Sequence, residues 1–186
     1  EITTRLVGSE MCIRDRTTCK ESYTIGTGDK RVALLDYGAK ANIAKSLVKR
    51  GCQVTVYPAS TPASVILKEK YDGIMLSNGP GDPEENVQII EEIKLLASSQ
   101  TPIFAICLGH QLMALAHGFK TEKMKYGHHG ANHPVKDLET GRVYISTQNH
   151  NFVIKEDSID SAVAKPWFIN VNDKTIEGVT LSLIHI

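Results

Sequence analysis

A single stretch, Pro102-Ile-Phe-Ala-Ile-Cys-Leu-Gly-His-Gln111, contains both halves of a strand–turn–helix unit. Its first half, Pro102–Cys107, is apolar and predicts a buried strand. The second half opens a helix predicted over Gly109–His117, which Gly118 ends. Buried strands that lead directly into helices are typical of parallel α/β sheets. The stretch therefore predicts one unit of such a sheet.

The same alternation of strand and helix precedes this unit. The predicted strands are Arg31–Asp36, Gln53–Tyr57 and Gly73–Ser77, and the predicted helices are Ala39–Arg50, Ala63–Lys70 and a segment from Pro83 to Ser98. After Lys120 the helical period fades, and Val143–Thr147, Phe152–Ile154 and Phe168–Val171 resemble strands joined by turns. We therefore expect an α/β fold with a doubly wound, mostly parallel open sheet, flavodoxin-like, and added β-strands in the C-terminal third.

Composition excludes several classes of function. The 186 residues carry 21 Lys+Arg and 21 Asp+Glu, so that the net charge is zero, and 41% of them are apolar. This balance does not favour binding to nucleic acid or to a membrane surface. No apolar stretch approaches the roughly 18 residues of a membrane span. The cysteines form no C-x-x-C pair, which favours a reducing, cytoplasmic location; they are Cys12, Cys19, Cys52 and Cys107.

The two ends of the chain share an unusual relationship. Met11–Arg16 can be encoded by a nucleotide string whose reverse complement translates as Leu181–Ile186. An inverted repeat of this kind is typical of translated library adapter. We therefore treat residues 1–16 and 181–186 as non-native, and expect the natural protein to continue in both directions.

Cys107 has the surroundings of a nucleophile. Ala105-Ile-Cys-Leu-Gly109 follows the small-x-nucleophile-x-small pattern of a nucleophile elbow, with cysteine in place of serine. The helix that follows would direct its positive end at the sulfur and favour the thiolate. The Leu108 N–H would then be one oxyanion donor, and the Gly79 N–H a second. The alternative is that Cys107 is a small buried core residue.

Several motifs resemble a known family. Pro102–Gln111 resembles the nucleophile motif of class I, triad-type glutamine amidotransferases, and Ser77-Asn-Gly-Pro-Gly-Asp-Pro83 resembles their oxyanion loop. More narrowly, Lys123-Met-Lys-Tyr-Gly-His-His-Gly-Ala-Asn-His-Pro-Val135 and Gln148-Asn-His150 are similar to the small-chain family of carbamoyl-phosphate synthases. The resemblance makes residues 30–180 a partial amidotransferase domain and residues 17–29 a linker from a missing N-terminal domain.

The resemblance implies a glutaminase. The Cys107 thiolate would attack the side-chain amide of L-glutamine and form a thioester that water cleaves. Ammonia would pass to a large chain, in a heterodimer or a higher assembly, that uses ATP, Mg and bicarbonate to make carbamoyl phosphate for arginine or pyrimidine biosynthesis. No cofactor is expected in this chain. The implied glutamine-binding residues are Gly79, Gly81, Leu108, Gln111, Asn149, Asn151 and Phe152.

The sequence also departs from the family. Ala105 and Asn151 stand where glycine is usual, and no His-Pro-Glu, which carries the family's general base, occurs in the chain. General acid–base catalysis commonly contributes about 10²–10⁴-fold to a rate. We therefore expect little or no glutaminase activity from this polypeptide alone.

Five histidines raise the question of a metal. His110, His128, His129, His133 and His150 match no paired zinc signature, so no metal site is predicted and hydrogen bonding that fixes loops is the favoured role. Three other functions stay open. They are another class I amidotransferase subunit such as that of anthranilate synthase, a silent homologue that acts as a binding partner, and a cysteine hydrolase for other amides.

Overall fold

The computed structural model describes residues 18–181, and the chain divides into two compact units between Met113 and Ala114. Each unit is described by itself. The two terminal segments predicted to be non-native lie outside the described residues, except for Leu181. Among residues 18–181, no helix is long and apolar enough to cross a membrane.

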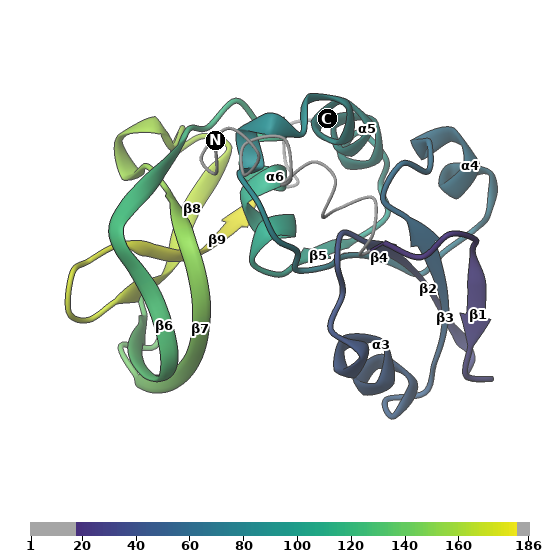
Figure 1. Ribbon diagram of the computed structural model, residues 1–186, viewed down its shortest axis with the longest axis horizontal. Helices are drawn as coiled ribbons and strands as arrows, with labels where there is room; N and C mark the ends of the chain where they lie inside the picture. Colours follow the sequence, from purple (N-terminus) through teal and green to yellow (C-terminus); the bar gives the residue numbers. More distant parts are fainter. Residues whose placement is uncertain (1–17, 182–186) are drawn as a thin grey trace, which may run out of the picture. The chain divides into compact units, whose positions relative to one another are not determined.

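The first unit is built on a five-stranded sheet in the order β1-β3-β2-β4-β5 (Figure 1). Strands β2 to β5 are parallel, whereas β1 pairs antiparallel with β3 and lies within the segment predicted to be a linker. The strands are β1 Tyr23–Ile25, β2 Lys30–Asp36, β3 Cys52–Pro58, β4 Gly73–Leu76 and β5 Ile103–Ala105. The doubly wound, mostly parallel sheet is therefore confirmed.

Helices connect these strands and cover both faces of the sheet. They are α3 Ala41–Val48, α4 Ala63–Lys68 and α5 Val87–Ala97, and α6 Leu108–Ala116 follows β5, the last strand of the sheet. Helix α3 lies on one face, and α4 and α5 lie on the other (Figure 1). Right-handed crossovers require this arrangement, because the path from β2 to β3 runs opposite to the path from β3 to β4. The order of strands therefore reverses between β2 and β4.

Apolar side chains from the sheet and from α3 form one buried core cluster of the first unit. Leu34, Val54 and Val56 are fully or almost fully buried at the centre of this cluster. Ile43 and Leu47, four residues apart, pack against it from α3, as their helical spacing predicts. Gly51 follows α3 with a φ of 82°, a left-handed angle that suits glycine at a helix end.

One predicted helix is divided in two. The segment from Pro83 begins as a short 3₁₀ turn, Pro83–Glu85, and α5 starts only at Val87. The Asn86 side chain donates hydrogen bonds to the Asp82 and Pro83 carbonyls, at 2.8 and 3.0 Å. Because asparagine competes for backbone carbonyls in this way, it interrupts the helix.

The second unit contains a closed barrel in the order β6-β7-β9-β8. Its strands are β6 Thr121–Asp137, β7 Val143–Ile154, β8 Ala164–Asn170 and β9 Ile176–Leu181, with a 3₁₀ turn at Glu156–Ser158. The added strands are confirmed, but β7 is one strand where two were predicted, and β6 and β9 were not predicted. Phe119, Ile154 and Ile176 belong to its buried core.

Candidate active site

The candidate site in the first unit lies at the carboxyl ends of three parallel strands. Asp36 ends β2, Ser77 follows β4, and Cys107 follows β5 by two residues. In open α/β sheets, ligands bind beyond these ends, and especially where the strand order reverses. The reversal between β2 and β4 therefore places the Ser77–Pro83 loop at the expected position for a ligand.

Cys107 occupies the sharp turn between β5 and α6. Its φ is +52°, a left-handed angle that is uncommon for a residue with a side chain, and its side chain is half-buried. A Cβ added at Gly109 would lie 2.6 Å from the Leu76 carbonyl oxygen, so only glycine fits there. These are the geometrical features of a nucleophile elbow.

The loop after β4 is held by polar contacts with the loop after β2. The Ser77 hydroxyl accepts a hydrogen bond from the Tyr37 N–H at 2.9 Å and donates one to the Asn78 carbonyl at 2.8 Å. The Asn78 side chain accepts from the Lys40 N–H at 3.1 Å and donates to the Gly38 carbonyl at 3.3 Å. Three of these hydrogen bonds join the predicted oxyanion loop to the loop after β2, and the bond from Ser77 to Asn78 lies within the oxyanion loop itself.

The loop and the elbow approach each other at Gly79. A Cβ added to Gly79 would lie 2.8 Å from the Leu108 side chain and closer still to the Tyr37 carbonyl. Within residues 18–181, no protein acceptor takes the N–H of Gly79 or of Leu108. Two donors on adjoining segments are what an oxyanion site requires.

The remaining predicted residues of the first unit lie on the same two segments. Gly81 has a φ of +96° in the loop after β4, which favours glycine. Gln111 lies in the first turn of α6, where its backbone N–H donates to the Cys107 carbonyl at 3.0 Å, and it is buried. Their contact with glutamine stays a prediction.

Asn149, Asn151 and Phe152, the other predicted glutamine-binding residues, lie on β7 in the second unit. The side-chain oxygens of both asparagines are hydrogen-bonded to the His129 ring. The Asn149 oxygen lies 2.8 Å from Nδ1, and the Asn151 oxygen lies 3.1 Å from Nε2. The Lys123 ammonium lies 6.0 Å from the centre of the Phe152 ring. The structure thus brings these three residues together on one strand, with His129 as an anchor for two of them.

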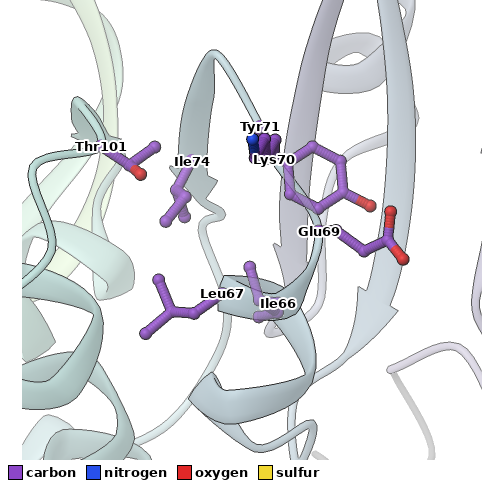
Figure 2. Close-up of a pocket in the computed structure, with 7 residues that line it drawn as sticks. All are labelled: Ile66, Leu67, Glu69, Lys70, Tyr71, Ile74 and Thr101. Atoms are coloured by element: carbon purple, nitrogen blue, oxygen red, sulfur yellow. The ribbon is translucent and has the colours of Figure 1, made fainter.

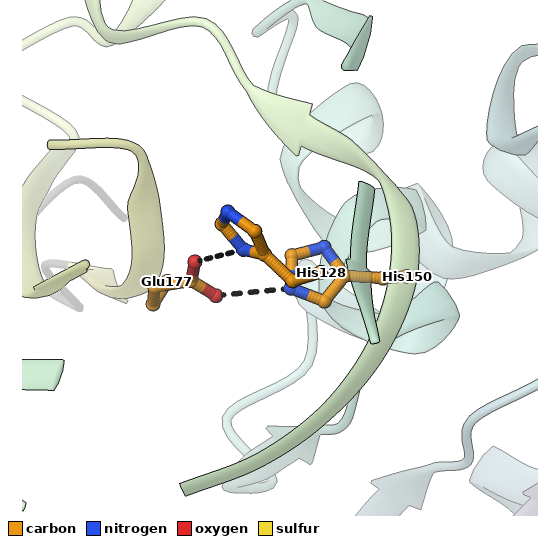
Figure 3. Close-up of side chains that lie close together, drawn as sticks. All are labelled: His128, His150 and Glu177. Carbon is orange, nitrogen blue, oxygen red and sulfur yellow. Dashed lines mark ion pairs between the residues drawn. The ribbon is translucent and has the colours of Figure 1, made fainter. Parts of the chain in front are cut away.

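A second cluster gathers two of the five histidines around a residue that was not predicted. His128 and His150, on β6 and β7, both contact the carboxylate of Glu177 on β9 (Figure 3). The spacing could not indicate this cluster, because Glu177 lies far along the chain and belongs to no histidine motif. One signal was present, namely that Glu177 is the single charged residue of the segment Ile176–Leu181.

The pKa values of this cluster shift in opposite directions. Burial lowers the pKa of His150, but the Glu177 carboxylate and the Phe152 carbonyl outweigh burial and raise it above its ordinary value. Burial raises the pKa of Glu177, but His150 and then His128 outweigh burial and lower it. The fold therefore favours positive charge on the imidazole side and negative charge on the carboxylate.

A shallow pocket lies elsewhere in the first unit (Figure 2). Its volume is about 190 Å³, and it is lined by residues of α4, by Tyr71 and Ile74 near the start of β4, and by Thr101. It lies at the amino ends of β4 and β5, away from the carboxyl ends at which ligands bind in such sheets. Its volume is also below the usual range of about 300–1,000 Å³ for ligand pockets.

Comparison with known proteins decides the family. The sequence profile described as glutamine amidotransferase class-I matches residues 33–182. The chain belongs to the class I glutamine amidotransferase family. A solved glutamine amidotransferase from Thermotoga maritima has the same fold, with a TM-score of 0.64 over 83% of this chain and 73% of that one, at 14% identity.

Within the class I amidotransferases, this chain is similar to proteins named carbamoyl phosphate synthase small chain. It is 53% identical to that of Pseudomonas syringae pv. tomato over 154 residues, which cover 81% of this chain and 40% of the relative. It is 47% identical to that of Listeria monocytogenes serotype 4b over 167 residues, which cover 90% and 46%. The chain thus spans less than half the length of these curated relatives.

Proposed function

We propose that this chain is the glutamine-hydrolysing part of a carbamoyl-phosphate synthase small chain. The observation that carries the proposal is the left-handed turn at Cys107 beside the glycine loop at Gly79. The sequence identity of 47–53% to proteins named carbamoyl phosphate synthase small chain supports this assignment over the anthranilate synthase type.

The proposed reaction proceeds through a thioester. The Cys107 thiolate attacks the side-chain amide carbon of L-glutamine, and the negative oxygen of the tetrahedral intermediate accepts hydrogen bonds from the N–H groups of Gly79 and Leu108. The C–N bond breaks, the nitrogen takes up a proton and leaves as ammonia, and water then cleaves the thioester to glutamate. Gln111, Gly81 and the β7 residues Asn149, Asn151 and Phe152 are proposed to bind the rest of the amino acid.

The rest of the synthesis is assigned to a partner. Ammonia would pass to a carbamoyl-phosphate synthase large chain that uses ATP, Mg and bicarbonate, in a cytoplasmic complex that serves arginine or pyrimidine biosynthesis. No cofactor is needed for glutamine hydrolysis itself, because the sulfur and the two N–H donors supply the chemistry of attack.

Covalent labelling tests the glutaminase assignment. The 186-residue chain is treated with a chloroketone analogue of glutamine, and each cysteine is followed by peptide mass spectrometry. We expect an adduct on Cys107, slowed by L-glutamine but not by L-glutamate, because only glutamine presents the neutral side-chain amide. The Cys107→Ser variant should lose this adduct.

Cys19 and Cys52 provide the internal control. Both thiols are partly exposed to solvent, as Cys107 is, but neither lies at a strand–helix turn. Equal labelling of Cys19, Cys52 and Cys107 would contradict the proposal and favour a silent homologue. The same would follow if L-glutamine did not slow the labelling of Cys107.

A further inference from the structure

His128, His150 and Glu177 meet inside the second unit. Their side chains expose only 8%, 13% and 8% of their surface. His128 Nδ1 lies 2.9 Å from one oxygen of Glu177, and His150 Nε2 lies 3.2 Å from the other (Figure 3). Buried charges at this depth require compensation by a partner or a metal.

The outer nitrogen of each ring is held by an acceptor. His128 Nε2 lies 2.7 Å from a carboxylate oxygen of Asp173, and His150 Nδ1 lies 3.0 Å from the Phe152 carbonyl. Because neither oxygen can donate, both of these nitrogens carry the hydrogen. In the neutral rings, the inner nitrogens then direct lone pairs at the Glu177 carboxylate, which is itself an acceptor.

Acceptors that face one another require a cation between them. Two further protons, one on each inner nitrogen, would meet this need, and so would one metal ion. The inner nitrogens of His128 and His150 both lie at ion-pair distance from the Glu177 carboxylate. A metal ion needs convergent lone pairs rather than aligned N–H bonds.

The three ligand atoms converge as a metal site requires, since all lie within 4.8 Å of one another. The outer contacts with Asp173 and Phe152 match the usual arrangement in which a metal-binding histidine donates its other N–H to a carboxylate or carbonyl. Two imidazoles and one carboxylate are a ligand set that suits zinc.

We propose that His128, His150 and Glu177 bind one zinc ion that joins β9 to the β6–β7 hairpin. The strand pairing shows why such a link matters, because β7 pairs with β9 only at Ile154 and Ile176. Since side chains alternate along a strand, the ion would lie on the face of β7 opposite Asn149 and Asn151. It would therefore support the strand that carries them, whether or not they bind glutamine.

Metal titration of the untagged 186-residue chain tests this site. The chain is stripped with a chelator and titrated with zinc against a chromophoric indicator at neutral pH. We expect one equivalent to bind and the melting temperature to rise with it. Glu177→Gln and His150→Gln should weaken binding at least about 10²-fold, because each removes a direct ligand.

Three further variants keep the test decisive. Asp173→Asn leaves every ligand in place and should weaken zinc binding about 10–100-fold, so it remains informative if the ligand variants fold poorly. The matched controls, His129→Gln beside His128 and Glu122→Gln on the exposed side of β6, should bind zinc normally. A folded chain that binds no zinc, or binds it equally in all variants, overturns the proposal and assigns the positive charge to protons.

Discussion

The positive φ at Cys107 is enforced by contacts with the neighbouring strand β4 and is not a preference of cysteine itself. A side chain in the left-handed region costs of order 1–3 kcal/mol and persists only where its surroundings enforce it. Two hydrogen bonds do so here, from the Ile106 N–H to the Leu76 carbonyl at 3.0 Å and from the Gly109 N–H to the Ser77 carbonyl at 3.1 Å. The elbow and the segment after β4 therefore form one structural unit.

This dependence predicts the effect of Gly109→Ala. The new methyl group would lie 2.6 Å from the Leu76 carbonyl oxygen, a distance that forces the turn away from β4. Overpacking costs about 1–3 kcal/mol, and the helix propensity of alanine offsets at most about 1 kcal/mol of it. We expect a lower free energy of unfolding in urea and slower labelling of Cys107 by the glutamine analogue.

Gly73→Ala is the matched control for this substitution. The added Cβ would lie 3.6 Å from the Pro102 carbonyl oxygen, an ordinary contact at the start of β4. Its stability and labelling rate should match those of the parent chain. If Gly109→Ala behaved like Gly73→Ala, the elbow would not be tightly packed against β4.

At the scale of elements, the turn between β6 and β7 depends on Asp137. One carboxylate oxygen accepts from the N–H groups of Glu139 and Thr140, at 2.9 and 3.3 Å, and the other accepts from the Thr140 hydroxyl at 2.8 Å. The Thr140 hydroxyl lowers the pKa of Asp137 most, burial opposes it, and the two N–H groups add to the lowering. The folded hairpin therefore prefers the ionised carboxylate.

A lowered pKa in the folded state makes stability depend on pH with a definite sign. The contribution of Asp137 is present above the ordinary aspartate pKa of about 3.9 and is lost as the pH falls through the lower pKa of the folded state. Asp137→Asn removes this ionisation. We expect the urea midpoint of the variant to lie below that of the parent at about pH 6, and the gap to narrow near pH 3.

Asp157→Asn serves as the control for this pH dependence. Its carboxylate is exposed and reaches only Lys155, at 3.9 Å, and such surface pairs contribute little. This variant should follow the parent at both pH values. A gap for Asp137→Asn that stayed constant or widened in acid would show that the charge of Asp137 does not stabilise the hairpin.

The elements differ in how far their sequences predict them. The strands and helices of the first unit follow clear apolar periods, so β2–β5 and α3–α6 are predicted within a few residues of their ends. Strand β6 shows no such alternation, because Gly127 and Gly130 adopt positive φ and the pairing with β7 shifts register on either side of them. Period-based reasoning fails where bulges interrupt a strand.

At the scale of the molecule, predictability depends on how far apart the cooperating residues lie in the chain. Cys107 and the loop at Gly79 each belong to a local motif, and β4 and β5 are neighbours, so the sequence indicates both halves of that site. The cluster of His128, His150 and Glu177 unites three strands of a barrel. Its members share no local pattern, and only the closure of the barrel brings them together.

The proposed chemistry predicts that labelling and turnover separate in this polypeptide. Attack on an electrophile needs only the Cys107 sulfur and the donors at Gly79 and Leu108, whereas turnover also needs a group that carries protons to ammonia and from water. The His-Pro-Glu motif, which the resemblance implies as the source of that group, does not occur among the 186 residues. We expect glutamate release, measured by a coupled dehydrogenase assay, to be about 10²–10⁴-fold slower than in an amidotransferase that carries the motif. A longer polypeptide that includes such a motif should recover turnover with little change in the rate of labelling. Turnover by the 186-residue chain at the rate of a complete enzyme would contradict this assignment, because another residue would then have to supply the base.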